Sequence, residues 1–176
     1  RGVQMAKAAG EKTKRNKKTR MRIGESIISL MHEIPYDEIK ISEVSKQADV
    51  SRMTFYQYYS TKEEALKDYI NEIVEEYLEN EGGKDNTDIL SYRQIMSTLK
   101  FFDRYSDFFL SLVKAERHSF VIDAFNDYVA GYLLRSKKRS EYEVYYYAGA
   151  LFNVFMQWEL HGKKEPVEQI AKLFAK

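Results

Sequence analysis

Hydroxyl, amide and cationic side chains are concentrated in one short stretch of the sequence, between Ser51 and Lys62. Serine, threonine and tyrosine hydroxyls can donate hydrogen bonds to phosphate oxygens, and Arg52 and Gln57 can read the edges of bases. An ammonium group near a helix start, as at Lys62, can bind phosphate together with the free backbone N–H groups there. The chemistry that these residue types favour is recognition of a nucleic acid.

Two short predicted helices position these side chains. The first covers residues 43–48, and Ser42 is its expected N-cap because its hydroxyl can accept a free backbone N–H. Asp49 stands in the turn that follows, and Ser51 is expected to cap a second helix at residues 52–58. Two short helices joined by a tight turn are typical of a helix-turn-helix, whose second helix enters the major groove of DNA.

The two helices need a shared core to hold their crossing angle, and Val44, Ala48, Val50 and Phe55 are expected to supply it. The polar and outward positions around that core are then left to face DNA. The predicted DNA-binding residues are Ser42, Ser51, Arg52, Met53, Thr54, Tyr56, Gln57, Tyr58 and Lys62.

The segment from Val50 to Leu66, read with Ile41, Val44 and Ala48 ahead of it, resembles the signature of the TetR family of bacterial transcriptional regulators. The resemblance covers about residues 17–77. It implies a homodimer that binds a palindromic operator in double-stranded DNA, generally as a repressor, and that releases the DNA when a small molecule enters the C-terminal part.

The resemblance also assigns roles to single residues. Thr54, Tyr56 and Lys62 match positions that contact phosphate in the family, whereas Arg52 and Met53 fall on variable positions where sequence choice resides. Asp49 departs from the pattern, because the family usually has glycine there. Aspartate tolerates the left-handed backbone conformation better than most residues. The tight turn between the two predicted helices is therefore expected to form with Asp49 in place of glycine.

Charge is divided unevenly along the chain. Residues 1–62 carry 13 Lys or Arg against 7 Asp or Glu, and the remainder carries 15 against 20. A basic N-terminal part points to a polyanionic partner. An alternative from another class is a helical scaffold whose basic arm binds a membrane or RNA without reading sequence.

Helical spacing of apolar residues runs through the rest of the chain, and the sequence predicts an all-α fold. Residues 1–16 are expected to be a flexible basic arm, residues 17–62 a helix-turn-helix head, and residues 63–176 a helical body for effector binding and dimerisation. The connecting helix is predicted to end near residue 80, where Gly82 and Gly83 break the pattern. Further helices are predicted at residues 90–105, 107–115, 119–136 and 141–161, with a last short one from Pro166.

The body contains a segment, Tyr142 to Trp158, that is apolar or aromatic almost all round. A helix without a solvated face must be covered on both sides, so one side is predicted to contact a second subunit. The predicted dimer-interface residues are Tyr145, Gly149, Phe152, Phe155 and Met156. The predicted effector-binding residues, chosen as aromatic side chains that could line a pocket, are Phe102, Tyr105, Phe109, Phe125, Tyr128, Tyr147 and Phe152. An ordinary aromatic core is the alternative for each of these rings, and a body that responds to a partner protein is the alternative to an effector.

Other functions find little support in the sequence. The chain has no cysteine, and its three histidines stand in no metal-binding motif, so no metal, cofactor or catalytic residue is predicted. The longest apolar stretch is too short to cross a bilayer of about 30 Å, and no signal peptide is recognised. A soluble cytoplasmic protein that is not an enzyme is therefore expected.

Overall fold

The computed structural model describes residues 2–77, 79, 91–128 and 140–175, with side chains described for residues 16–77, 79, 91–124, 126, 140–143 and 145–175. Within these residues the regular structure is helical and no strand occurs, which confirms the predicted all-α fold class. The chain divides into two compact units, Arg1–Glu72 and Ile73–Lys176, called here the head and the body. The elements are α1 (Gly2–Met31), the 3-10 helix η1 (Tyr36–Glu38), α2 (Ile41–Gln47), α3 (Arg52–Tyr58), α4 (Lys62–Tyr77), α5 (Tyr92–Arg104), α6 (Ser106–Lys114), α7 (Ser119–Tyr128), α8 (Glu141–Leu160) and α9 (Val167–Phe174).

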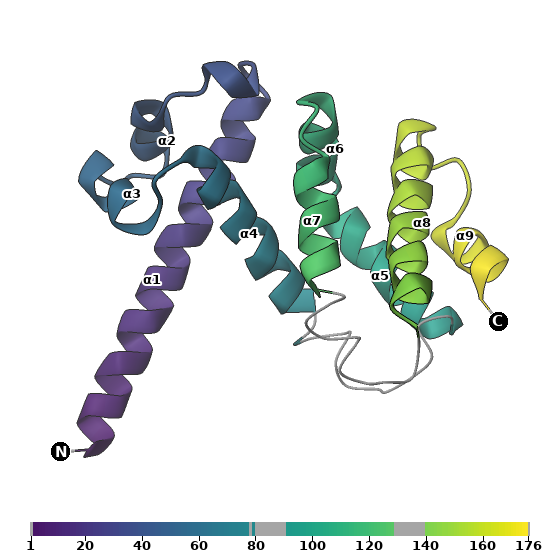
Figure 1. Ribbon diagram of the computed structural model, residues 1–176, viewed down its shortest axis with the longest axis horizontal. Coiled ribbons are helices and arrows are strands. Elements are labelled where there is room, and N and C mark those ends of the chain that lie inside the picture. Colours follow the sequence, from purple (N-terminus) through teal and green to yellow (C-terminus); the bar gives the residue numbers. More distant parts are fainter. Residues whose placement is uncertain (1, 78, 80–90, 129–139, 176) are drawn as a thin grey trace. The chain divides into compact units, whose positions relative to one another are not determined.

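The first helix is longer than the sequence predicts. Its backbone is helical from Gly2, so it includes the segment expected to be a flexible arm (Figure 1). Alanine, lysine and other strong helix formers make up most of that segment, and no proline interrupts it. The helix ends at Met31, before Pro35, in agreement with the bias of a pre-proline residue against the α region.

The helix-turn-helix is formed by α2 and α3, and α2 packs against α1 (Figure 1). Val44, Ala48 and Phe55 are at most 2% exposed, so they supply the core of this motif as predicted. α2 begins at Ile41, earlier than expected, because the Glu43 carboxylate accepts a 2.9 Å hydrogen bond from the backbone N–H of Lys40. Lys40 is therefore the N-cap in place of Ser42.

A close approach and a set of ion pairs join α4 to α1. A Cβ atom added at Gly24 would lie 2.5 Å from the Cβ of Tyr69, so only glycine fits at this contact. Nearby, Arg20 forms ion pairs with Asp68 (3.1 Å) and Glu72. The first part of α4 thereby belongs to the head, and the division falls after Glu72 rather than at the predicted residue 62.

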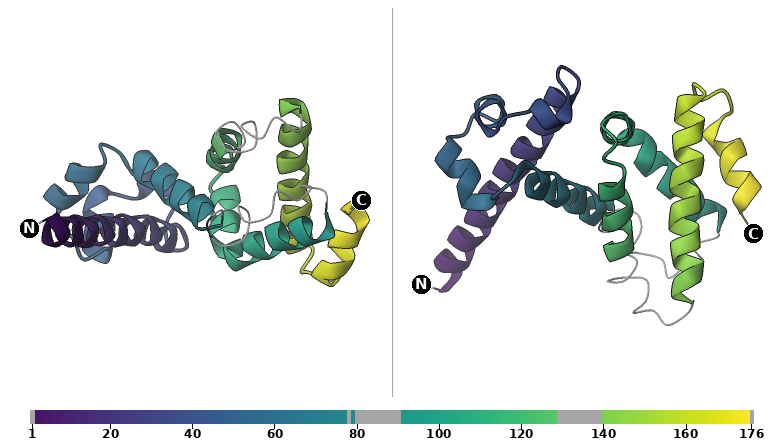
Figure 2. Two further views of the ribbon diagram at one scale, coloured as in Figure 1. Left: turned by 90° about the horizontal axis from the view of Figure 1, so that it is seen from below. Right: turned by 45° about the horizontal axis from the view of Figure 1, so that its top comes forward.

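The body is arranged around α5, which packs against α6, α8 and α9, while α7 packs against α8. Figure 1 and the right-hand view of Figure 2 both show α8 lying between α7 and α9. The predicted helix at residues 119–136 is observed as far as Tyr128, and its remainder lies outside the described residues. In the described part of the chain, no helix combines the length and the apolar composition needed to span a membrane.

Candidate DNA-binding site

One face of α3 projects away from the core of the head. Arg52, Met53, Tyr56 and Gln57 are all exposed on it, Met53 by 74% and Tyr56 by 51%. Their spacing of one, four and five residues places them side by side on the helix surface. Among the described residues, Arg52 has no hydrogen-bonding or ion-pair partner, so its guanidinium group is available to a ligand. The structure thus brings four of the predicted DNA-binding residues together on one surface.

Ser51 and Thr54 mark the start of α3. The hydroxyl of Ser51 accepts a 2.9 Å hydrogen bond from the backbone N–H of Thr54, so Ser51 is the helix cap that the sequence predicts. The two hydroxyl groups lie 2.8 Å apart and hydrogen-bond to each other. One of the two hydroxyl groups uses its hydrogen in this contact, and the other keeps its hydrogen for a further acceptor at the edge of the exposed face of α3.

The turn between α2 and α3 has the backbone that its sequence predicts. Asp49 has a φ of 51°, in the left-handed region where the family usually has glycine. Arg22 on α1 stabilises this turn by donating hydrogen bonds to the carbonyl oxygens of Ala48 and Asp49. The sequence offered no local signal for this contact, because Arg22 counts there only as one of many basic residues.

Two tyrosines at the end of α3 face the interior of the head. Tyr58 is half-buried, and its hydroxyl donates a 3.1 Å hydrogen bond to the side-chain oxygen of Asn16 on α1. Tyr59 is buried and donates a 2.5 Å hydrogen bond to Asp68 on α4. Burial, reinforced by this hydrogen bond, raises the pKa of Tyr59 well above its usual value. In this structure Tyr58 contacts α1 instead of joining the exposed face of α3.

The ammonium group of Lys62 is enclosed by backbone carbonyl oxygens. Its Nζ atom lies 2.6 Å from the oxygen of Tyr36, 3.2 Å from that of Ile39 and 3.3 Å from that of Asp37. The ring of Tyr36 covers the same ammonium at 4.5 Å from its centroid. An ammonium has three N–H donors, and all three are directed at carbonyl oxygens here. Lys62 therefore holds the turn after η1 and offers no N–H to a phosphate in this state.

Several charged residues predicted to be solvated or to face a polyanion form internal contacts. Lys17 lies 2.6 Å from Glu72, and Arg20 pairs with the same carboxylate. Glu72 on α4 is only 6% exposed. Two cations compensate its charge, which is why it can lie buried against α1.

In the body, the described aromatic side chains predicted to bind an effector mostly pack against one another. Phe102, Phe109 and Phe152 are buried, with ring centroids 5.4 to 5.7 Å apart. The hydroxyl of Tyr105 donates a 3.1 Å hydrogen bond to Glu76, and Tyr147 is half-buried. The side chains of Phe125 and Tyr128 lie outside the described residues. These contacts are typical of an aromatic core, the alternative that the sequence left open.

The predicted dimer-interface residues divide between two sides of α8. Phe155 is fully buried, 5.2 Å from the ring of Phe102, so it belongs to the core of one subunit and cannot lie at an interface. Tyr145, Gly149, Phe152 and Met156 instead line an open groove between α7 and α8.

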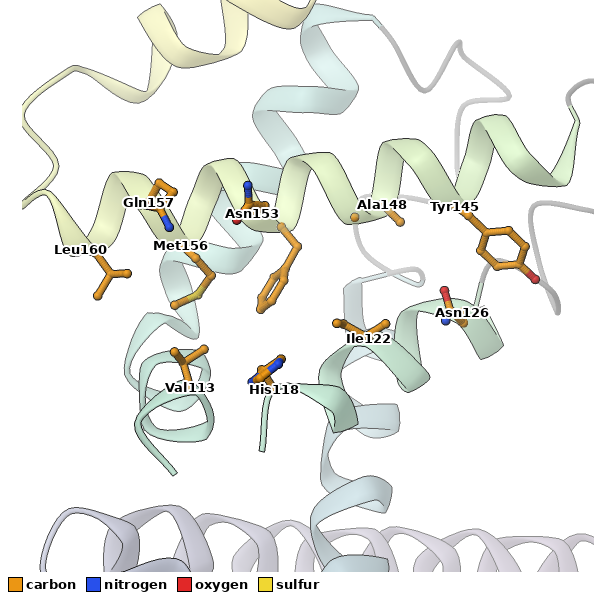
Figure 3. Close-up of a pocket in the computed structure, with 12 residues that line it drawn as sticks. Val113, His118, Ile122, Asn126, Tyr145, Ala148, Asn153, Met156, Gln157 and Leu160 are labelled. Atoms are coloured by element: carbon orange, nitrogen blue, oxygen red, sulfur yellow. The ribbon is translucent and has the colours of Figure 1, made fainter. Parts of the chain in front are cut away.

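The groove has a volume of about 410 Å³. Figure 3 shows Met156 and Leu160 of α8 pointing toward Val113 and His118, with Ile122 reaching toward α8 from the opposite wall. The described residues that line it are Val113, His118, Ile122, Asn126, Tyr145, Ala148, Gly149, Phe152, Asn153, Met156, Gln157 and Leu160, and none of these is Lys, Arg, Asp or Glu. Within the described residues, no group of three or more His, Asp or Glu side chains is arranged to hold a metal ion.

A capped helix with an exposed polar face, fixed on a second short helix by a tight turn, defines a helix-turn-helix DNA-binding protein. Residues 25–68 match the sequence model described as bacterial regulatory proteins, tetR family. The helix-turn-helix and its flanking helices, over residues 25–68, therefore match a TetR-family DNA-binding domain, as the motif predicts. A comparison with curated protein sequences finds no match.

Solved structures share the fold at low sequence identity. FadR from Bacillus halodurans, a fatty acid degradation regulator, is 16% identical over 88% of this chain and 91% of that one, with a TM-score of 0.56. The dihydroxyacetone kinase operon activator DhaS is 20% identical over 89% and 91%, also with a TM-score of 0.56. The transcriptional regulator FadR from Bacillus subtilis, in complex with stearoyl-CoA, is 14% identical over 88% and 94%, with a TM-score of 0.54. At these identities the likeness concerns the fold alone.

Proposed function

We propose that the protein is a homodimeric repressor that binds a palindromic operator through α3 and releases it when a small-molecule effector binds the body. The family of the head makes the protein a DNA-binding regulator. Beyond this, we propose that the protein is a dimer, that its operator is a palindrome, that it represses, that an effector releases it, and that it catalyses no reaction.

The exposed face of α3 is the observation that supports base reading. Arg52 can donate a pair of hydrogen bonds to guanine, and Gln57 can form the equivalent pair with adenine. The hydroxyl group of Tyr56, and whichever of the Ser51 and Thr54 hydroxyl groups does not donate to the other, can donate to phosphate. Such contacts position the helix without reading sequence.

Of the other predicted DNA contacts, Ser42 is kept in the proposal, whereas Tyr58 and Lys62 are given a structural role. Ser42 is exposed in the first turn of α2, where its hydroxyl can reach a phosphate. Tyr58 and Lys62 are assigned to support of the head, because their polar atoms bind Asn16 and the carbonyl oxygens of residues 36–39.

Selection of random duplexes by the purified protein, followed by affinity titration at two salt concentrations, tests this proposal. A palindrome is expected to be enriched. The Arg52→Ala variant is expected to enrich a different base at one position of each half-site, whereas Tyr56→Phe is expected to weaken binding to all duplexes by a similar factor. Lys172→Ala on the exposed side of α9 is the control, with unchanged selection.

The scaffold alternative makes the opposite prediction. A basic arm that binds polyanions has only phosphate contacts, so it would enrich no sequence and would lose affinity steeply as salt rises. That result would overturn the proposed function.

The compound that binds the body and releases the operator can be tested separately. Stearoyl-CoA, bound by the Bacillus subtilis relative, makes a long-chain acyl-CoA the first compound to test as an effector. An effector is expected to raise the melting temperature of the protein and to lower its operator affinity. A panel of acyl-CoA thioesters and their free fatty acids should be tested. If none of them changes the melting temperature or the operator affinity, a body that responds to a partner protein is favoured. The packed aromatic rings around Phe102 agree with that alternative.

A further inference from the structure

Two large hydrophobic side chains of the head are exposed, and both lie on α3. Among residues 16–72, whose side chains the structure describes, Met53 is 74% exposed and Tyr56 is 51% exposed, while the other large hydrophobic side chains are buried or half-buried. The hydroxyl group of Tyr56 gives its ring a polar end that can bind water or phosphate. Met53 has no such group, so its exposure needs a different explanation.

The local fold does not require an apolar side chain at Met53. This residue is the second of α3, and the core of the motif is filled by Phe55 from the opposite side of the helix. Lysine, glutamine or glutamate would favour the helix about as well and would be better solvated. A single exposed apolar side chain is common elsewhere on a protein surface, but this one lies within the face that is proposed to read base edges.

The exposed face of α3 consists of two rows of side chains. Residues four apart are neighbours on a helix surface, so Met53 stands beside Gln57, and Arg52 stands beside Tyr56. At about 1.5 Å per residue, Met53 and Gln57 are about 6 Å apart along the helix axis. Successive bases of one DNA strand are about 3.4 Å apart. In a helix that follows the major groove, these two side chains can therefore reach bases one or two steps apart.

Thymine is the base whose major-groove edge fits an apolar side chain. Guanine and adenine present only hydrogen-bonding groups there, cytosine presents an amino group, and thymine adds a methyl group. Methionine has no strong hydrogen-bond donor or acceptor with which to read the other three bases. Its three rotatable bonds let the thioether of Met53 adjust to the position of a methyl group.

No carboxylate on α3 opposes a close approach to DNA. The helix contains no Asp or Glu between Arg52 and Tyr58. The acid of the preceding turn, Asp49, lies 3.3 Å from the guanidinium group of Arg22, which offsets its charge. The face around Met53 can therefore approach base edges to van der Waals contact, at about 4 Å.

We infer that Met53 packs against the 5-methyl group of a thymine in each half-site of the operator, within two base steps of the base that Gln57 reads. The inference rests on the proposed function and adds the base chemistry that one residue recognises. Met53 determines specificity by an apolar contact, whereas Arg52 and Gln57 do so by hydrogen bonds. Removal of a single methyl group from the DNA is therefore expected to weaken binding.

Replacing thymine with deoxyuridine tests this inference, because the change removes only the 5-methyl group and leaves every hydrogen-bonding group of the base in place. The probe is the duplex that the wild-type protein selects, with one thymine position at a time replaced in both half-sites. At one position, the replacement is expected to weaken wild-type binding by about fourfold for each half-site. Met53→Ala is expected to bind the thymine and deoxyuridine duplexes with equal affinity.

Further variants separate an apolar contact from a merely structural role. Met53→Leu keeps an apolar side chain and is expected to keep most of the sensitivity to deoxyuridine, whereas Met53→Gln is expected to lose it. Gln57→Ala, in the same row, is the matched control, with altered base choice at its own position and full sensitivity to deoxyuridine. Both positions are exposed, so all these variants are expected to melt at the temperature of the wild type.

Failure of the inference and failure of the proposed function give different results. If the wild-type protein enriches no sequence, both are overturned. If it enriches an operator in which no thymine position responds to deoxyuridine, the inference alone is overturned. The same holds if the response to deoxyuridine is as large in Met53→Ala as in the wild type.

Discussion

Lys62 has the residue type and position of a phosphate contact, but in the structure it binds backbone carbonyl oxygens instead. Its ammonium group is surrounded by the carbonyl oxygens of residues 36–39 and by the ring of Tyr36. A strongly hydrated point charge exchanges its water for three carbonyl dipoles at this site. The turn that presents the start of α2 is thus tied to the start of α4 through a single side chain.

Replacing Lys62 with methionine is expected to destabilise the head by about 2 kcal/mol, because hydrogen bonds from a charged donor are lost and three carbonyl oxygens lose their partner. Urea unfolding measures this effect, with Lys172→Met on α9 as a control that changes stability little. The slope of log operator affinity against log salt concentration is expected to stay nearly constant. A fall of about one unit in that slope, with unchanged stability, would instead make Lys62 a phosphate contact.

Tyr59 is expected to make the stability of the head depend on alkaline pH. The folded protein keeps the Tyr59 proton because its pKa is raised, whereas the unfolded chain ionises near pH 10. Its contribution is therefore complete below that pH and falls as pH rises above it, by up to about 1.4 kcal/mol per pH unit. Urea unfolding at pH 8, 9, 10 and 11 is expected to show the stability advantage of wild type over Tyr59→Phe shrinking above pH 10. The exposed Tyr142→Phe variant should show no such trend, and an equally constant difference for Tyr59→Phe would contradict the argument.

At the scale of elements, the contact between α1 and α4 holds the head together. The helices approach so closely at Gly24 that a methyl group would overlap the Cβ of Tyr69. Arg20 and Lys17, one and two turns before Gly24 on α1, pair with Asp68 and Glu72, which lie on either side of Tyr69 on α4. The close backbone contact at Gly24 and the ion pairs of Lys17 and Arg20 therefore both hold α1 against α4.

The Gly24→Ala variant tests whether this approach is required. Alanine favours a helix by about 1 kcal/mol, but the overlap with a backbone-proximal atom cannot be relieved by rotating a side chain. The net expectation is a loss of about 2 kcal/mol in the free energy of unfolding, read by urea titration, while Glu25→Ala on the exposed side changes it by less than about 0.5 kcal/mol. An increase in stability for Gly24→Ala would show that α1 and α4 separate without cost.

A structural feature could be predicted from the sequence when the residues that cause it are close together in the chain. The Ser51 cap and the left-handed Asp49 depend on neighbours within three residues, and both are observed as predicted. The roles of Arg22, Gly24 and Lys62 depend on partners more than 20 residues away, and no local pattern indicates them. Spacing likewise indicated that α8 is apolar on all sides. It could not say which side faces the core, so Phe155 was assigned to an interface.

At the scale of the whole molecule, the proposed function joins a DNA-binding head to a body with an exposed and uncharged helix surface. Two half-sites of a palindrome are contacted together only if two heads are linked, and linkage multiplies affinity by about 100-fold to 10,000-fold. A substitution that blocks dimerisation is therefore expected to lower operator affinity as well.

The Tyr146→Glu variant tests this coupling. Tyr146 is 73% exposed in a single chain, so the substitution should leave the fold of the subunit intact. In a dimer that covers the exposed side of α8, it would bury an unpaired carboxylate, at a cost large enough to separate the subunits. Sedimentation is expected to show a monomer whose affinity for the full operator falls at least about 100-fold while its affinity for an isolated half-site is unchanged. Leu173→Glu, a similarly exposed position on α9, should remain a dimer with full affinity. If Tyr146→Glu stays dimeric and binds the operator normally, the subunits must associate through a surface other than the exposed side of α8 around Tyr146.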